Sequence, residues 1–74
     1  MLLVNTDFIT GKNLETIGIV NGIGIALTRK GEINQAHEEM KREANELGAD
    51  AIINIRYTYG PRGIFASGTA VRFI

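Results

Sequence analysis

The 74-residue chain contains no cysteine and no tryptophan, and it has a single histidine and a single proline. Without cysteine it forms no disulfide, and one histidine cannot supply the Cys/His ligands of a structural zinc site. Small domains usually need a cross-link, a metal or a partner subunit, because a short chain buries too little of its surface. These absences leave self-association as the expected source of further stability.

The chain also lacks an excess of charge of either sign, since eight basic and eight acidic residues give a formal net charge of zero. Proteins that bind nucleic acids or membrane surfaces usually show a basic excess, so we expect neither as a partner. No apolar run is long enough to span a bilayer. The first residues lack the basic region of a signal peptide and reach Asp7 early. We therefore expect one cytoplasmic domain over residues 1–74.

Hydrophobic periodicity predicts five elements in the order β-β-α-β-β. The predicted strands cover residues 2–6, 14–28, 51–59 and 64–74, and the predicted helix covers residues 32–47. Gly48 stands where a left-handed residue ends a helix. A turn at residues 60–63 joins the last two strands into a hairpin. The pattern predicts an α+β fold: a three- to four-stranded, mainly antiparallel sheet with one helix packed on one face.

The strand predicted over residues 14–28 has one bulky and one bare face. Its alternation sets Ile17, Ile19, Ile23, Ile25 and Leu27 against Gly18, Val20, Gly22, Gly24 and Ala26. Glycine inside a strand is typical of a bulge or of close approach by another element. The same period of two places Ala51, Ile53, Ile55, Tyr57 and Tyr59 together in the next strand.

A single helix covers only one face of such a sheet, yet few charges occupy either face of the strands. An uncovered apolar face of this size is typical of an association surface. We therefore expect a ring-forming homo-oligomer with cyclic symmetry. The predicted interface residues are Ile17, Ile19, Ile23, Tyr57, Phe65 and Phe73.

Few residues are candidates for ligand chemistry. His37 is followed by Glu38 and then Lys41, so one imidazole and one carboxylate offer an incomplete metal site within a protomer. A histidine on the helix surface is the alternative interpretation. In a ring, copies of His37 could share a metal ion.

Three basic residues are candidates for binding an anion or another small ligand. Arg29 and Lys30 precede the predicted helix, whose first amides favour an anion. Solvated loop charges are the alternative. Arg56 lies on a strand beside Tyr57 and would serve either a ligand or a salt bridge between subunits, since arginine is favoured at interfaces.

Nothing in the sequence favours an enzyme. Ser67 is the only serine, and its surroundings do not form a nucleophile elbow. His37 and the aspartates are spread over different elements, which gives a catalytic triad no support. We expect a non-enzymatic protein, while a composite active site between subunits stays open as an alternative.

Three segments resemble the YbjQ-like family, also labelled a heavy-metal-binding domain: residues 47–52 (LGADAI), 56–57 (RY) and 66–71 (ASGTAV). Asn21-Gly22 fits more loosely. The resemblance implies a dodecin-like α+β subunit that assembles into a ring, often a pentamer, with no established reaction. Longer members have an insertion where residues 26–32 here pass straight into the helix, so this chain resembles a short member.

The function that the resemblance implies is an uncharacterised homo-oligomer that binds a small ligand or ion at its subunit interfaces. A carrier of a metal, selenium or an oxyanion is the alternative, and no cofactor is identified. Some short relatives are associated with selenium through a cysteine. This chain has no cysteine, so that route does not transfer to it.

Overall fold

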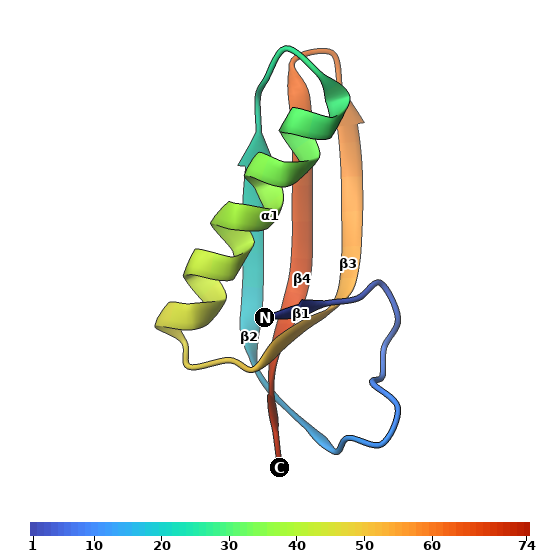
Figure 1. Cartoon of the computed structure of the whole chain (residues 1–74), viewed down its shortest axis with the longest axis vertical. Helices are drawn as coiled ribbons and strands as arrows, with labels where there is room; N and C mark the ends of the chain where they lie inside the picture. The colour runs from blue at the N-terminus through green and yellow to red at the C-terminus, as the bar shows by residue number, and fades with distance from the viewer.

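The computed structural model describes all residues from Met1 to Ile74. The elements along the chain are β1 (Leu2–Leu3), β2 (Leu14–Gly24), α1 (Arg29–Glu46), β3 (Ala51–Gly60) and β4 (Gly63–Phe73). They form one four-stranded sheet in the order β1-β3-β4-β2, in which β1 runs parallel to β3 and the other pairs are antiparallel. Helix α1 lies across one face of this sheet (Figure 1). The predicted α+β fold and element order are confirmed.

Helix α1 begins earlier than predicted, at Arg29 instead of Glu32. Thr28 has an extended backbone, and its hydroxyl accepts a hydrogen bond of 3.0 Å from the Gly31 amide. A threonine in this position satisfies one of the free amides of the first helical turn. The helix ends as predicted, with Gly48 at a φ of 79° after the C-cap residue Leu47.

The bare face of β2 is where α1 packs. A Cβ atom at Gly22 would stand 2.0 Å from the carbonyl oxygen of Ala36, and one at Gly24 would stand 1.7 Å from that of Glu32. No side chain fits at either place, so the glycines let the helix backbone lie directly on the strand. The expectation of close packing on this face is confirmed.

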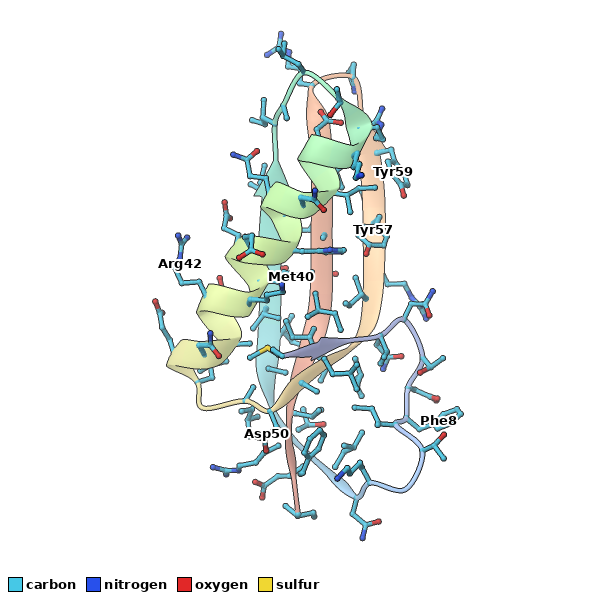
Figure 2. All side chains as sticks on the ribbon, in the orientation of Figure 1. Phe8, Met40, Arg42, Asp50, Tyr57 and Tyr59 are labelled. Atoms are coloured by element: carbon cyan, nitrogen blue, oxygen red, sulfur yellow. The ribbon has the colours of Figure 1, made fainter.

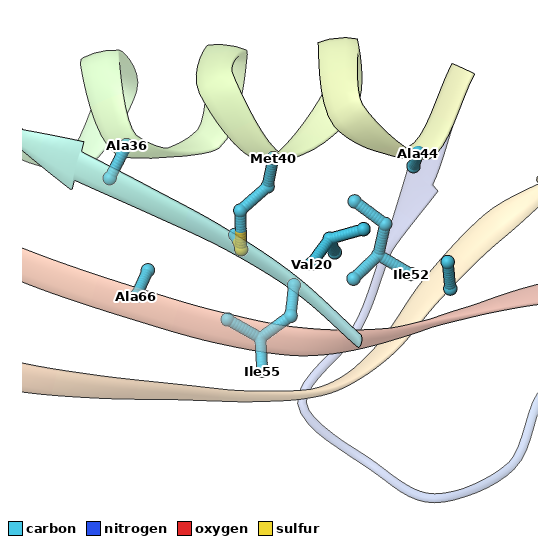
Figure 3. Packing of buried hydrophobic residues seen from close by; sticks show 8 residues of the cluster. Val20, Ala36, Met40, Ala44, Ile52, Ile55 and Ala66 are labelled. Atoms are coloured by element: carbon cyan, nitrogen blue, oxygen red, sulfur yellow. The ribbon is translucent and has the colours of Figure 1, made fainter. Parts of the chain in front are cut away.

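The main core lies between α1 and the sheet. Met40 points from the middle of the helix to the sheet, with Ala36 and Ala44 one turn to either side (Figure 3). Small helical residues keep the two layers close, and Met40 fills the space that remains. The buried sheet residues of this core are Val20, Ile52, Ile55, Ala66 and Ala70.

Two β-bulges interrupt the alternation that the sequence predicts for β2 and β3. The register between β2 and β4 shifts between Thr16 and Gly18, and Ile17 packs against the main core instead of sharing a face with Ile19. In β3 the register shifts around Asn54, whose φ is 55°. A bulge adds one unpaired residue, so it reverses the face of every side chain that follows.

The bulge in β3 therefore divides the residues that were predicted to share one face. Ala51 and Ile53 lie on the face away from α1, in a small second core. Ile55 belongs to the main core, and Tyr57 packs against it. The strict alternation predicted for residues 51–59 is wrong at this point, because the pattern of apolar and polar residues in the sequence does not indicate a bulge.

The face opposite α1 is covered only in part. Val4, Ile9 and Leu14 pack over its lower end. The chain between β1 and β2 swings out past β3 and returns to β2 at that end of the molecule (Figure 1). The upper part of this face has no covering element. It exposes Ile19 and Ile23, which are 64% and 49% accessible, together with Ile25 and Phe65. We call these four residues the open face.

Candidate functional site

A pocket of about 420 Å³ lies at the junction of the N-terminal segment, α1 and β3. His37 reaches it from the helix and Tyr57 from the strand, while Ile55 contributes apolar surface. The labelled Tyr57 lies beside α1 in Figure 2. The remaining lining residues are Leu3, Val4, Asn5 and Thr6. The pocket thus combines an apolar wall with several polar groups.

A hydrogen bond of 2.6 Å joins Nε2 of His37 to the hydroxyl of Tyr57. Burial lowers the pKa of His37 below its usual 6.5, and Lys41 acts in the same direction while Glu38 opposes it. Burial also raises the pKa of Tyr57 above 10.0, with a smaller contribution from Tyr59. Both side chains are therefore neutral near pH 7, which lets one donate and the other accept.

This pair offers hydrogen bonding rather than charge to a ligand. A neutral imidazole and a phenol beside apolar side chains suit a small molecule with a polar group on an apolar body. A metal ion needs more ligands than this pair provides. No group of three or more His, Cys, Asp or Glu side chains in the chain stands close enough to hold one, so His37 would need ligands from other copies.

At the anion site predicted for the start of α1, Arg29 is already engaged by other side chains of the chain. Arg29 forms an ion pair of 3.1 Å with Glu32, and its guanidinium lies 5.3 Å from the ring centre of Tyr59. Lys30 is exposed and forms no ion pair. Arg29 and Lys30 are therefore the first two residues of α1, whereas the sequence predicted them to precede the helix, and Arg29 has internal partners.

Arg56 lies on the side of the sheet that also carries the open face, because it pairs with Ser67 on β4. It is exposed and forms no salt bridge within the chain. A shallow groove of about 270 Å³ lies nearby, between the ends of β2 and the hairpin. The groove residues are Ile23, Ile25, Thr58, Gly60, Arg62, Gly63, Ile64 and Phe65.

The structure brings only some of the predicted interface residues together. Ile19, Ile23 and Phe65 share the open face. Phe73 is half-buried against the second core, with Lys12 5.1 Å from its ring centre. Ile17 and Tyr57 pack on the helix side, because each follows a bulge or stands at one.

Sequence reasoning missed the pairing of His37 with Tyr57 and the pocket behind it. The two residues are 20 positions apart, and strict alternation placed Tyr57 on the wrong face. The lining by residues 3–6 was also missed, because the N-terminal strand was predicted as an ordinary strand. The arrangement depends on the register change at Asn54, which the alternation of the sequence does not indicate.

Comparison with known proteins supports the resemblance to the YbjQ-like family. The model of a family described as "Putative heavy-metal-binding", YbjQ_1, matches residues 26–74. A UPF0145 protein of Clostridium novyi is 37% identical, and one of Alkaliphilus metalliredigens is 38% identical, each over the whole of both chains. Both alignments run over 103 positions, so these relatives carry residues that this shorter chain lacks.

A solved structure shares the fold. It is a protein of unknown function of the DUF74 family from Pediococcus pentosaceus, with a TM-score of 0.78 and 14% identity over 100% of this chain and 98% of that one. No helix here has the length and apolar character needed to cross a membrane. On the family match and the full-length relatives, the chain belongs to the YbjQ-like family, whose function is uncharacterised.

Proposed function

We propose that the protein is a non-enzymatic subunit of a homo-oligomer and that it binds a small ligand. The observation that carries this proposal is the open face. Ile19, Ile23, Ile25 and Phe65 stand together on one side of the sheet, and no element of the chain covers them. Contiguous apolar surface of this kind is typical of a contact with another protein.

The size of the chain favours a copy of itself as the partner. The main core holds eight buried residues and the second core only three, so each protomer has little buried surface to offset the entropy of ordering its chain. Burying the open face would add apolar surface to both copies. The ring of five that the family resemblance implies stays a prediction, as does a cytoplasmic location.

The candidate ligand site is the pocket of His37 and Tyr57. Its neutral hydrogen-bonding pair and apolar wall support a small, partly polar molecule. The description of the family as heavy-metal-binding raises a second possibility, a metal ion shared by His37 side chains of several copies. Arg29 supports an oxyanion less well, because Glu32 and Tyr59 already engage it.

Native mass spectrometry of the purified protein tests both parts, because it reports the number of subunits and any retained mass. The matched variants are Ile19→Asp with Ile23→Asp on the open face and Leu27→Asp in the exposed loop before α1. We expect the open-face variant to be monomeric and Leu27→Asp to assemble like the wild type. A wild type that is monomeric at micromolar concentration would contradict the proposal.

The ligand part has its own control. A mass retained by the wild type and lost in His37→Ala, while assembly persists, would support the pocket as the binding site. Elemental analysis of the same samples separates a metal from an organic molecule. A retained mass that persists in His37→Ala would exclude this pocket.

A further inference from the structure

The two edges of the sheet differ in whether they can accept another strand. Three side chains of α1 bond to the edge of β2: Glu43 accepts from the amide of Asn21 at 3.2 Å, Glu39 from that of Ile23 at 3.4 Å, and Gln35 from that of Ile25 at 2.6 Å. These amides point away from β4 and would otherwise be free. The amides from Asn21 to Ile25, along the second half of the β2 edge and just past its end, are thus engaged by the chain's own helix.

Geometry explains why three bonds form in succession. Four helical residues advance about 6 Å, and two strand residues advance about 6.7 Å, so every fourth side chain of α1 meets every second amide of β2. In these three bonds the residue number of the partner on α1 falls as the number of the amide on β2 rises, so the two elements run antiparallel. Gly22 and Gly24 bring the helix close enough for these side chains to reach the edge.

The edge of β3 is closed only along its first half. β1 pairs with Ala51 and Ile52, and Val4 and Thr6 accept hydrogen bonds from the amides of Ile55 and Asn54. No strand lies beside β3 after that point. The vacant stretch runs from Arg56 to Gly60.

The hairpin register shows which backbone groups are free on this stretch. Gly60 pairs with Gly63 at the turn, and hydrogen-bonded pairs alternate from there along an antiparallel ladder. The amides and carbonyls of Tyr57 and Tyr59 therefore point outward. Neither residue takes part in a backbone hydrogen bond outside the regular elements, and no side chain bonds to their backbones.

We propose that the sheet accepts a strand from a second copy of this chain at the free edge of β3 and not along the second half of β2, where α1 engages the amides. This inference rests on the self-association proposed above and specifies which edge takes part in it. Unprotected strand edges readily pair with another chain, and natural proteins block the edges that must stay unpaired. Here α1 blocks the second half of the β2 edge, and nothing blocks the stretch of β3 from Arg56 to Gly60.

Two observations favour a second copy as the donor of the strand. The chain's own N-terminal residues already add to the first half of the edge of β3, so every copy carries a segment able to pair there. Arg56 and Thr58 also face the side of the sheet that carries the open face, so the vacant edge is continuous with the proposed contact surface. An added strand would run beside Tyr57, which lines the pocket.

One pair of variants removes a single outward amide from each edge. Proline has no amide and is tolerated on edge strands, so Tyr59→Pro alters the edge of β3 and Asn21→Pro that of β2. Tyr59→Ala and Asn21→Ala control for the lost side chains, and circular dichroism checks folding. Native mass spectrometry across a dilution series should show about tenfold weaker assembly for Tyr59→Pro and little change for Asn21→Pro.

A second set removes the block on β2. The triple variant Gln35→Ala, Glu39→Ala, Glu43→Ala loses all three acceptors, whereas Glu39→Gln with Glu43→Gln keeps acceptors and loses charge. A matched triple, Asn34→Ala, Glu38→Ala, Arg42→Ala, alters exposed residues at the same spacing on the helix. We expect only the first triple to form species larger than the wild type. This set does not depend on whether a proline variant folds.

The outcomes separate this inference from the proposed function. A wild type that assembles, with no added growth in the acceptor-free triple, would overturn the inference about the edges and leave self-association intact. The same holds if Asn21→Pro weakens assembly as much as Tyr59→Pro. A monomeric wild type would overturn both proposals.

Discussion

The two faces of the sheet are built in opposite ways. On the face toward α1, glycines lie where the helix comes nearest, and its backbone is so close that a single added carbon at Gly24 would overlap Glu32. Larger side chains such as Ile52 and Ile55 fill the space elsewhere on this face. On the open face, large side chains such as Ile19 and Phe65 stand exposed with no layer above them. Glycine thus marks the points where the helix backbone lies directly on β2, and exposed large side chains mark the part of the sheet that no element covers. The absence of a side chain at Gly22 and Gly24 indicates contact distance.

The comparison is tested most severely by adding volume to the covered face. Gly24→Val should destabilise the fold by about 3 kcal/mol or more, because its side chain has no space against the carbonyl of Glu32. Urea denaturation followed by circular dichroism measures the loss. Ile23→Val, the neighbouring residue on the open face, should stay within about 0.5 kcal/mol of the wild type. Equal losses in the two variants would remove the distinction between the faces.

Truncation of a large side chain on each face gives the next largest effect. Met40→Ala should cost about 3 kcal/mol at every protein concentration, because Met40 is fully buried within one protomer. Ile19→Ala should cost more as the concentration rises, because only assembled copies bury Ile19. Thermal denaturation over a hundredfold range of concentration distinguishes the two. A loss for Ile19→Ala that ignores concentration would count against the proposed assembly.

The start of the helix provides a smaller effect on the covered face. Thr28→Ala should cost about 1 kcal/mol, since it removes the oxygen that accepts from the Gly31 amide. Thr28→Asn should recover most of this loss, because asparagine also caps helices well. Thr10→Ala, at an exposed turn, is the control. Urea denaturation is again the measurement, and an unchanged Thr28→Ala would mean that packing on β2 alone positions the helix.

The smallest effect concerns pH at the pocket. The pKa of His37 is lower in the folded chain than in the unfolded one, so the unfolded state binds its proton first as pH falls below about 6.5. The contribution of His37 is thus complete above that pH and is lost progressively below it. His37→Gln should show a weaker fall in stability between about pH 7.5 and pH 5. An NMR titration of His37 that gives an ordinary pKa would contradict this.

The sequence allowed the prediction of the element order because each element has its own period. Ala36, Met40 and Ala44 repeat at helical spacing, and Gly22 and Gly24 alternate with isoleucines, so both patterns follow from local geometry. The helix start was less well predicted. Gly31 was placed before the helix, yet the capping threonine lies three residues earlier and leaves Gly31 inside the first turn.

The candidate site was much less predictable. Its central contact, between His37 and Tyr57, depends on which face of β3 Tyr57 occupies, and that depends on the bulge at Asn54. Asparagine tolerates a positive φ more easily than most residues, but many asparagines never adopt one. The closure of the edge of β2 by Gln35 depends in turn on how closely two elements pack. Such contacts are tertiary, and no local pattern specifies them.

The bulge at Asn54 also gives the gene one position in β3 where a change of length is tolerated. Loss of that codon would remove the unpaired residue, and Arg56 and Tyr57 would keep their partners on β4. Tyr57 would therefore stay beside His37. A deletion farther along β3 has no unpaired residue to absorb it and would turn the neighbouring side chains to the other face. Lineages that keep this pocket are therefore expected to vary in length at the bulge and not along the rest of β3.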